Sequence, residues 1–174
     1  MMRGASGEKC AYLLTLWTYG DRPVLGDAEA ARLFCRVLGH LRRRLAFHLH
    51  AFVVLPDRVR LIVATPDGDP RSVQVIVRRL KARFAREWNW RRGRLGLVWQ
   101  DADQMAALQG LQQIARRADL LHRSPVLAGL VRLPREWPWS SVRPWAGAGT
   151  APATVDLPEM PERRAPRPRP SVSG

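Results

Sequence analysis

The chain has 174 residues, of which 46% are apolar and 25% are charged, so it can form one domain with a packed core. Its 29 Lys and Arg residues against 15 Asp and Glu residues give a formal charge of +14, which indicates a polyanionic partner, with nucleic acid as the first candidate. No apolar run approaches the length of a membrane span, and the first residues lack the apolar core of a signal peptide; we therefore expect no membrane partner and a cytoplasmic location.

The first part of the chain predicts a strand, a helix and a hairpin. Residues 11–18 are rich in Leu, Thr and aromatic residues and precede Tyr-Gly, which indicates a strand. Asp27 is a suitable N-cap for a helix with one apolar stripe, and three arginines at 42–44 favour its C-terminal end. Residues 47–55 and 59–64 are apolar runs joined by Pro-Asp, which predicts two antiparallel strands.

The second part predicts a basic helix and less regular elements. Apolar residues between Val73 and Phe84 recur at helical spacing, and the other faces of that helix carry five basic side chains: Arg78, Arg79, Lys81, Arg83 and Arg86. Residues 97–100 are predicted to form a short fourth strand, and a third helix is expected from about 105 to 121. The order of elements predicts an α+β, ferredoxin-like split βαβ fold, with an antiparallel sheet of four to five strands and the helices on one face.

The composition also divides the chain. Residues 10–146 are predicted to form the single folded domain, preceded by an extension at 1–9. Residues 147–174 are rich in Pro and Arg, which predicts a disordered tail.

Three segments carry a recognisable pattern: HAFVVLPDRVRLIV at 50–63, VIVRRLKARFAREWN at 75–89 with a later Trp99-Gln100 pair, and SPVLAGLVRLPREWPWSSVRPW at 124–145. In this order they resemble the REP-associated tyrosine transposases of the single-tyrosine HUH superfamily. The third segment is the most specific, because its Pro, Gly and Trp spacings rarely recur by chance. Together with the first strand, the resemblance covers most of residues 10–145.

The resemblance implies a metal-dependent DNA-cleaving site, but the chain departs from it at each catalytic position. In the family, two histidines bind a divalent cation, a tyrosine attacks a DNA phosphate, and a polar residue four positions later supports the metal. These positions fall on Arg58 and Arg60, on Leu120 and on Ser124. A guanidinium has no free lone pair for a metal, and leucine has no nucleophile. We therefore expect no metal cofactor and no cleavage, and transposase-like DNA binding is the leading interpretation.

The expected partner is single-stranded or hairpin DNA, and a homodimer is compatible with the sequence. Its phosphates would contact the five basic residues of the second helix, with Arg58 and Arg60 as fixed cations in the former catalytic site. The alternative for the helix is a solvated charged face, and the two arginines can equally reflect drift after loss of activity.

Three further alternatives stay open. The triplet His48-Leu49-His50 allows an active transposase or nuclease with a relocated Mg²⁺ or Mn²⁺ site, although two histidines on one strand more often have no such role. A decayed transposase copy without function is also compatible with the sequence. Trp88 and Trp90, placed among arginines, can stack on bases or fill a local gap in the core.

Overall fold

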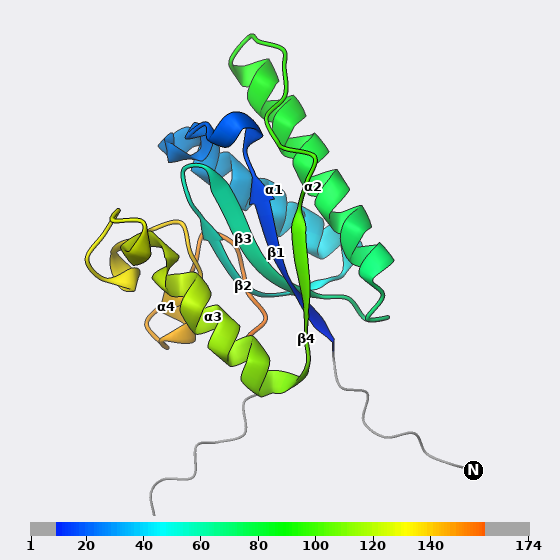
Figure 1. The fold of residues 1–174 in the computed structure, drawn as a ribbon, viewed down its shortest axis with the longest axis vertical. Coiled ribbons are helices and arrows are strands. Elements are labelled where there is room, and N and C mark those ends of the chain that lie inside the picture. The colour runs from blue at the N-terminus through cyan, green and yellow to red at the C-terminus, as the bar shows by residue number, and fades with distance from the viewer. Residues whose placement is uncertain (1–9, 159–174) are drawn as a thin grey trace, which may run out of the picture.

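A four-stranded antiparallel sheet forms the centre of the computed structural model, which describes residues 10–158 (Figure 1). Its strands are β1 (Ala11–Trp17), β2 (His48–Val54), β3 (Arg58–Ala64) and β4 (Gln104–Leu108), in the order β2-β3-β1-β4. Strand β3 pairs with both β1 and β2, so it separates the two strands that the first helix connects. This order is the split βαβ arrangement, and the predicted α+β fold is confirmed.

Helices cover both faces of the sheet. Helices α1 (Ala28–Leu45) and α2 (Pro70–Arg91) lie on one face, where their apolar stripes and β1 share a core that includes Leu14, Phe34 and Phe84. Asp27 and Asp69 cap these two helices by accepting hydrogen bonds from backbone N–H groups at 2.8 Å. The expectation of helices on one face therefore holds for α1 and α2 only.

Helix α3 (Gly110–Leu127) covers the opposite face through a second core, with Ile114, Ala118 and Leu121 against residues of β2 and β3 (Figure 1). Because successive side chains of a strand point to opposite faces, β3 sends Leu61 toward α1 and α2 and Ile62 toward α3. The same alternation places Arg60 on the α3 side. The remaining short helices are η1 (Tyr19–Asp21), η2 (Val24–Gly26), η3 (Pro134–Glu136) and α4 (Val142–Trp145).

The fourth strand and third helix begin later than the sequence predicts. Residues 97–100 contribute only one bridge, between Thr18 and Trp99, whereas β4 starts at Gln104 and pairs with β1. The predicted helix start at 105 was wrong because Met, Ala and Leu at 105–108 are good helix formers, and pairing with β1 overrides that local preference. Gly110, with a φ of 73°, marks the change from strand to helix.

The segment 137–141, W-P-W-S-S, covers the outer edge of β2. The backbone N–H of Val54 donates to the carbonyl of Trp139 at 2.8 Å, and the N–H of Ser141 donates to the carbonyl of Phe52 at 3.0 Å. The indole N–H of Trp137 donates to the Val54 carbonyl at 2.9 Å. An uncovered strand edge is prone to pairing with other chains, so this segment completes the sheet and protects it.

The chain after residue 146 continues to pack on the domain. Ala153 is 4% exposed, and the backbone N–H of Asp156 donates to the carbonyl of Leu49 at 2.7 Å. The Asp156 carboxylate accepts a hydrogen bond from the Leu49 N–H at 2.9 Å and pairs with Arg42. The predicted tail boundary at 147 was therefore too early, since these contacts anchor the chain beyond it. The predicted extension at 1–9 and the rest of the tail, 159–174, lie outside the described residues.

These contacts predict that ending the chain after Thr150 destabilises the domain, whereas ending it after Pro158 does not. The shorter chain loses the Arg42–Asp156 pair, the two backbone bonds to Leu49 and the buried Ala153. We expect a loss of about 2 kcal/mol in the free energy of unfolding, measured by urea denaturation. Equal stability of the two shortened chains would contradict this role of residues 151–158.

Of the helices in residues 10–158, none combines the length and the apolar character that a membrane span requires.

Candidate nucleic-acid interface

The fold brings together three of the four positions that the resemblance marks as former catalytic positions. Arg60 on β3 reaches across to α3, where its Nη1–H donates to the Ser124 Oγ at 3.0 Å. Ser124 follows Leu120 by one helical turn, and its Oγ lies 3.5 Å from the Leu120 carbonyl oxygen. Leu120 itself is 46% exposed. Arg60 of the strand thus contacts the buried Ser124 of α3, one helical turn from the exposed Leu120.

Arg58 extends this position along β3. It lies two residues before Arg60 and therefore on the same face of the sheet, about 7 Å away along the strand. Its guanidinium carbon lies 4.9 Å from the ring centroid of Trp17, the residue directly opposite it in β1, and it pairs with Asp57 at 2.9 Å. The tryptophan ring and the aspartate hold this arginine in a fixed place.

The charge around Arg60 is not balanced within the described chain. No carboxylate of residues 10–158 lies within 4.0 Å of its guanidinium, in contrast to Arg58. Burial lowers the pKa of Arg60, and the positive charges of Arg58 and Arg117 lower it further. Arginine stays protonated even so, which means that a cation is held at an electrostatically unfavourable place. We call Arg58, Arg60, Arg117 and Ser124 the arginine site; its chemistry fits an anion and does not fit a metal ion.

The five basic residues of α2 do not join the arginine site, because α2 packs on the opposite face of the sheet. Arg78, Arg79 and Arg86 are exposed to solvent. Arg83 pairs with Glu87 at 2.9 Å, one turn further along the helix. Sequence alone could not separate the two groups, since the face on which each element packs depends on the chain's three-dimensional arrangement.

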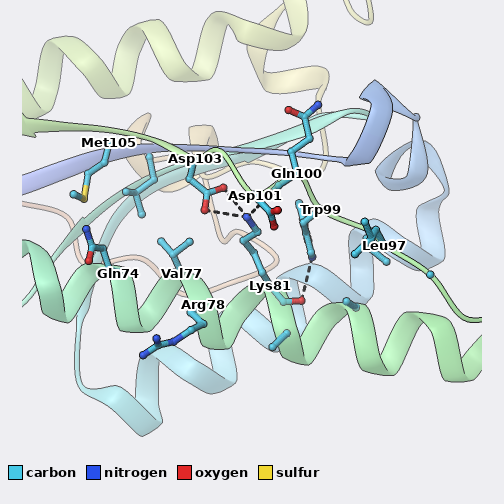
Figure 2. Close-up of a pocket in the computed structure, with 15 residues that line it drawn as sticks. Gln74, Val77, Arg78, Lys81, Leu97, Trp99, Gln100, Asp101, Asp103 and Met105 are labelled. Carbon is cyan, nitrogen blue, oxygen red and sulfur yellow. Dashed lines mark hydrogen bonds and ion pairs between the residues drawn. The ribbon is translucent and has the colours of Figure 1, made fainter.

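Lys81 lines a cavity of about 610 Å³ between α2 and residues 96–105 (Figure 2). Its ammonium donates to the Asp103 carboxylate at 2.8 Å and to the Gln100 carbonyl at 2.5 Å. The indole N–H of Trp99 donates to the Lys81 backbone carbonyl at 3.1 Å, as Figure 2 shows. These bonds attach the segment before β4 to α2. The positive charge of Lys81 is balanced by the Asp103 carboxylate.

Comparison with known proteins gives a match at the level of the fold. No protein-family model and no curated protein sequence matches the chain. Among solved structures, the chain is similar to the REP-associated tyrosine transposase bound to a REP hairpin, with a TM-score of 0.67 and 21% sequence identity over 92% of this chain and 94% of that chain. The chain has the fold of a REP-associated tyrosine transposase.

A second solved structure, of a Deinococcus radiodurans R1 protein assigned as a transposase, shares 23% identity over 69% of this chain and 98% of that chain. Its TM-score of 0.49 is too low to establish a common fold.

On this transposase fold, His48 and His50 lie on β2, where a bulge interrupts the pairing with β3. Their rings are stacked with centroids 6.2 Å apart. The His50 Nδ1 lies 2.7 Å from the Asp156 carbonyl oxygen, and the His48 Nδ1 lies 4.0 Å from the Asp156 carboxylate, which Arg42 also binds. Within residues 10–158, no group of three or more His, Cys, Asp or Glu residues is arranged to hold a metal ion.

His122 is a buried residue of the transposase fold whose partner the sequence did not reveal. Its Nε2 lies 2.8 Å from the Ser141 Oγ, and that oxygen also accepts the backbone N–H of Phe52 at 2.9 Å. The imidazole therefore connects α3 to the segment that covers β2. Burial lowers the pKa of His122 to about 4, so the ring is neutral at pH 7. The Ser-Ser pair that ends W-P-W-S-S was the only signal for this contact.

The two tryptophans near the end of α2 differ in environment. Trp88 is 3% exposed and stacks on Phe84, with the Arg92 guanidinium 4.4 Å from its ring centroid. Trp90 is 82% exposed. Trp88 is thus a core residue, and only Trp90 of this pair presents its ring to solvent.

Proposed function

We propose that the protein binds single-stranded or hairpin DNA through the arginine site and does not cleave it. The observation that carries this proposal is Arg60, a half-buried cation fixed by Ser124 with no nearby carboxylate among the described residues. A nearby anion would stabilise the charge of this guanidinium, and a DNA phosphate is such an anion. The similar solved transposase is bound to a REP hairpin, which supports the choice of ligand.

The geometry explains how the site would hold a phosphate. The planar guanidinium of arginine can donate two parallel N–H groups to phosphate oxygens. Arg60 already uses Nη1 on Ser124, which fixes the orientation of the group before binding. Arg58 is fixed by Trp17 and lies two residues before Arg60, on the same face of β3. Arg60 supplies a cation with no carboxylate nearby, and Arg58, although its Nη1 is paired with Asp57, supplies a second guanidinium on the same strand. Together they form the phosphate clamp of this proposal.

The same site lacks the groups that cleavage needs. Leu120 presents a hydrocarbon side chain to solvent where the resemblance places a nucleophile. Arg58 and Arg60 repel a divalent cation at the former ligand positions. A bound strand would accordingly be released intact.

Helix α2 supplies a second set of phosphate contacts in this proposal. Arg78, Arg79 and Arg86 are exposed, whereas Lys81 and Arg83 are engaged with Asp103 and Glu87. Since α2 lies on the opposite face, these three arginines would add sequence-independent attraction and not contact the nucleotides held by the arginine site.

Replacing both clamp residues, Arg58→Ala with Arg60→Ala, is expected to weaken binding of a labelled hairpin by about 10-fold or more, because two charge-assisted hydrogen-bond donors are lost. Fluorescence anisotropy at several salt concentrations should also show a salt dependence reduced by about two phosphate contacts.

The matched control is Arg43→Ala with Arg44→Ala, which removes the same charge from exposed positions of α1. It should retain most of the affinity. No binding by the natural chain at low salt would refute the proposed function, and equal losses in the two double variants would refute the arginine site as the place of binding.

A further inference from the structure

Strand β4 is the second edge of the sheet, and it lacks the cover that protects β2. In the order β2-β3-β1-β4 it pairs with β1 alone. Within residues 10–158, no backbone hydrogen bond joins 104–107 to any segment other than β1, and all four residues are exposed. The outer side of β4 therefore presents backbone donors and acceptors that the rest of the described chain does not use.

The sequence of β4 contains none of the features that usually keep an edge strand from pairing. Its residues, Q-M-A-A-L, include no charged residue and no proline, and its pairing with β1 runs from Gln104 to Leu108 without a bulge. Natural edge strands are commonly blocked by lysine, by proline or by a bulge. Because W-P-W-S-S covers the other edge, β4 is the edge of this sheet that can accept an added strand.

The cavity of about 610 Å³ lies directly beside this edge, between β4 and α2 (Figure 2). Leu14 of β1 and Met105 of β4 are opposite each other in the sheet, and both line the cavity. Directly opposite residues of paired strands point to the same face of a sheet. A residue of an added strand opposite Met105 would thus continue this row and direct its side chain into the cavity. Val77 and Trp99 extend the apolar lining, which fits an apolar side chain.

The charges around the cavity favour an acidic strand. Arg78 lines the cavity from α2, and within residues 10–158 no carboxylate lies within 4.0 Å of its guanidinium. Of the two acidic residues in the lining, Asp103 is neutralised by Lys81, and Asp101 lies at the end of the cavity near Gln100. A second copy of this chain would add a further formal charge of +14, which opposes self-pairing.

We propose that the β4 edge binds an extended acidic segment of another protein, which adds a strand to the sheet and inserts one apolar side chain beside Met105. Alternate residues of a strand face the same side, so the segment has an acidic residue two positions from the apolar one, where it can meet Arg78. This partner is additional to the DNA of the proposed function, because the cavity and the arginine site lie on opposite faces of the sheet.

Fluorescence anisotropy with the full chain and the labelled peptide Thr-Glu-Thr-Leu-Thr-Glu-Thr tests this surface. The peptide has Glu on both sides of Leu because parallel and antiparallel pairing would place different Glu residues near Arg78. We expect saturable binding, together with slower hydrogen exchange of the amides of 104–108. Replacing Leu of the peptide by Ala should weaken binding by about 10-fold. Replacing its Thr residues by Pro should abolish binding, because proline has no N–H for the added strand.

Variants of the chain locate the binding. Met105→Glu places a carboxylate at the cavity and should abolish binding of the acidic peptide. Its matched control, Ala106→Glu, adds the same charge at the next exposed residue, whose side chain points to the opposite face, and should retain most of the affinity. Arg78→Ala should lose about 3-fold, whereas Arg79→Ala, which removes the same charge outside the cavity lining, should not. Unchanged thermal unfolding will show that each variant is folded.

Four results would overturn the proposal. The first is no saturable binding of the acidic peptide up to about 1 mM, and the second is equal binding of a peptide with Lys in place of Glu. Slow exchange of 104–108 that requires a high protein concentration and no peptide would assign the edge to a second copy. Displacement of the peptide by a single-stranded oligonucleotide as effectively as by unlabelled peptide would assign it to nucleic acid. Hairpin binding is measured separately with the Arg58 and Arg60 variants, so its failure would leave this test unaffected.

Discussion

A variant with four substitutions is expected to form a covalent adduct with hairpin DNA in the presence of Mn²⁺, while the natural chain forms none. The substitutions restore the residue types that the resemblance places at the catalytic positions: Arg58→His, Arg60→His, Leu120→Tyr and Ser124→Asn. The tyrosyl oxygen would form a bond to the phosphorus of the DNA phosphate. The bond between that phosphorus and the 3′ oxygen of the adjoining nucleotide would break, and this nucleotide would leave with a 3′-hydroxyl. The product is a protein–DNA band on a denaturing gel.

The structure gives a physical reason to expect this gain. Arg60 and Ser124 already approach within 3.0 Å, and Leu120 lies one turn from Ser124 with 46% of its surface exposed. The backbone that would carry the restored groups is therefore in position, and only side chains must change. A tyrosine at 120 can reach solvent without displacing core residues.

Two controls define the result. The same variant with Leu120→Phe in place of Leu120→Tyr keeps the aromatic ring and lacks the nucleophile, so it should form no adduct. An adduct with the natural chain, abolished by His48→Ala with His50→Ala, would instead establish the relocated metal site. A folded variant with all four substitutions and no adduct would show that the scaffold has lost more than its catalytic side chains.

The stability of the natural domain is expected to fall by about 3 kcal/mol between pH 6.5 and pH 4 because of His122 alone. Burial lowers the pKa of this imidazole to about 4, whereas an unfolded chain has the ordinary value near 6.5. In this interval the unfolded state binds more protons than the folded state. The contribution is fully present above pH 6.5 and is lost as the pH falls toward 4.

Urea denaturation at several pH values measures this effect. The substitution His122→Gln should flatten the pH dependence in this interval, at the cost of some stability at pH 7 through the altered contact with Ser141. His40→Gln is the comparison: the pKa of His40 is lowered in the same direction, by burial and by nearby Arg83, Arg44 and Arg43, but its shift is smaller, so this variant should flatten the slope less than His122→Gln does. An unchanged slope in the His122 variant would contradict the assignment.

The Asp156 carboxyl group affects the stability of the fold mainly at lower pH. Burial raises its pKa, but the hydrogen bonds from Arg42 and from the Leu49 N–H outweigh burial and lower it. A lowered carboxyl pKa stabilises the fold above the ordinary value near 4, and that stabilisation is lost only at lower pH. The two effects therefore meet near pH 4, with His122 dominating above this pH and Asp156 contributing mainly below it.

The topology could be predicted because local patterns and packing agree for most elements. Alternation in β2 and β3, the apolar stripes of α1 and α2, and the caps at Asp27 and Asp69 each match the structure. Prediction was wrong where a local preference conflicts with a tertiary contact. The helix-forming residues at 105–108 form an edge strand, and the proline-containing segment at 151–158 packs through Asp156.

The candidate site was predictable in part for the same reason. The alternation of β3 and the four-residue spacing of Leu120 and Ser124 were visible, and the structure brings Arg60 to Ser124. The separation of α2 from Arg58 and Arg60 was not visible, because a charged face does not reveal which side of the sheet its helix covers.

The covering of β2 by W-P-W-S-S changes how this motif should be used to identify related proteins. The contacts described for Trp137, Trp139 and Ser141 close the edge of β2 or, through His122, join this segment to α3, and none of them reaches the Arg60 position. A chain can therefore need these residues to stay monodisperse whether or not it cuts DNA. In this chain the motif reports a closed sheet edge, and by itself it carries no information on whether DNA is cut.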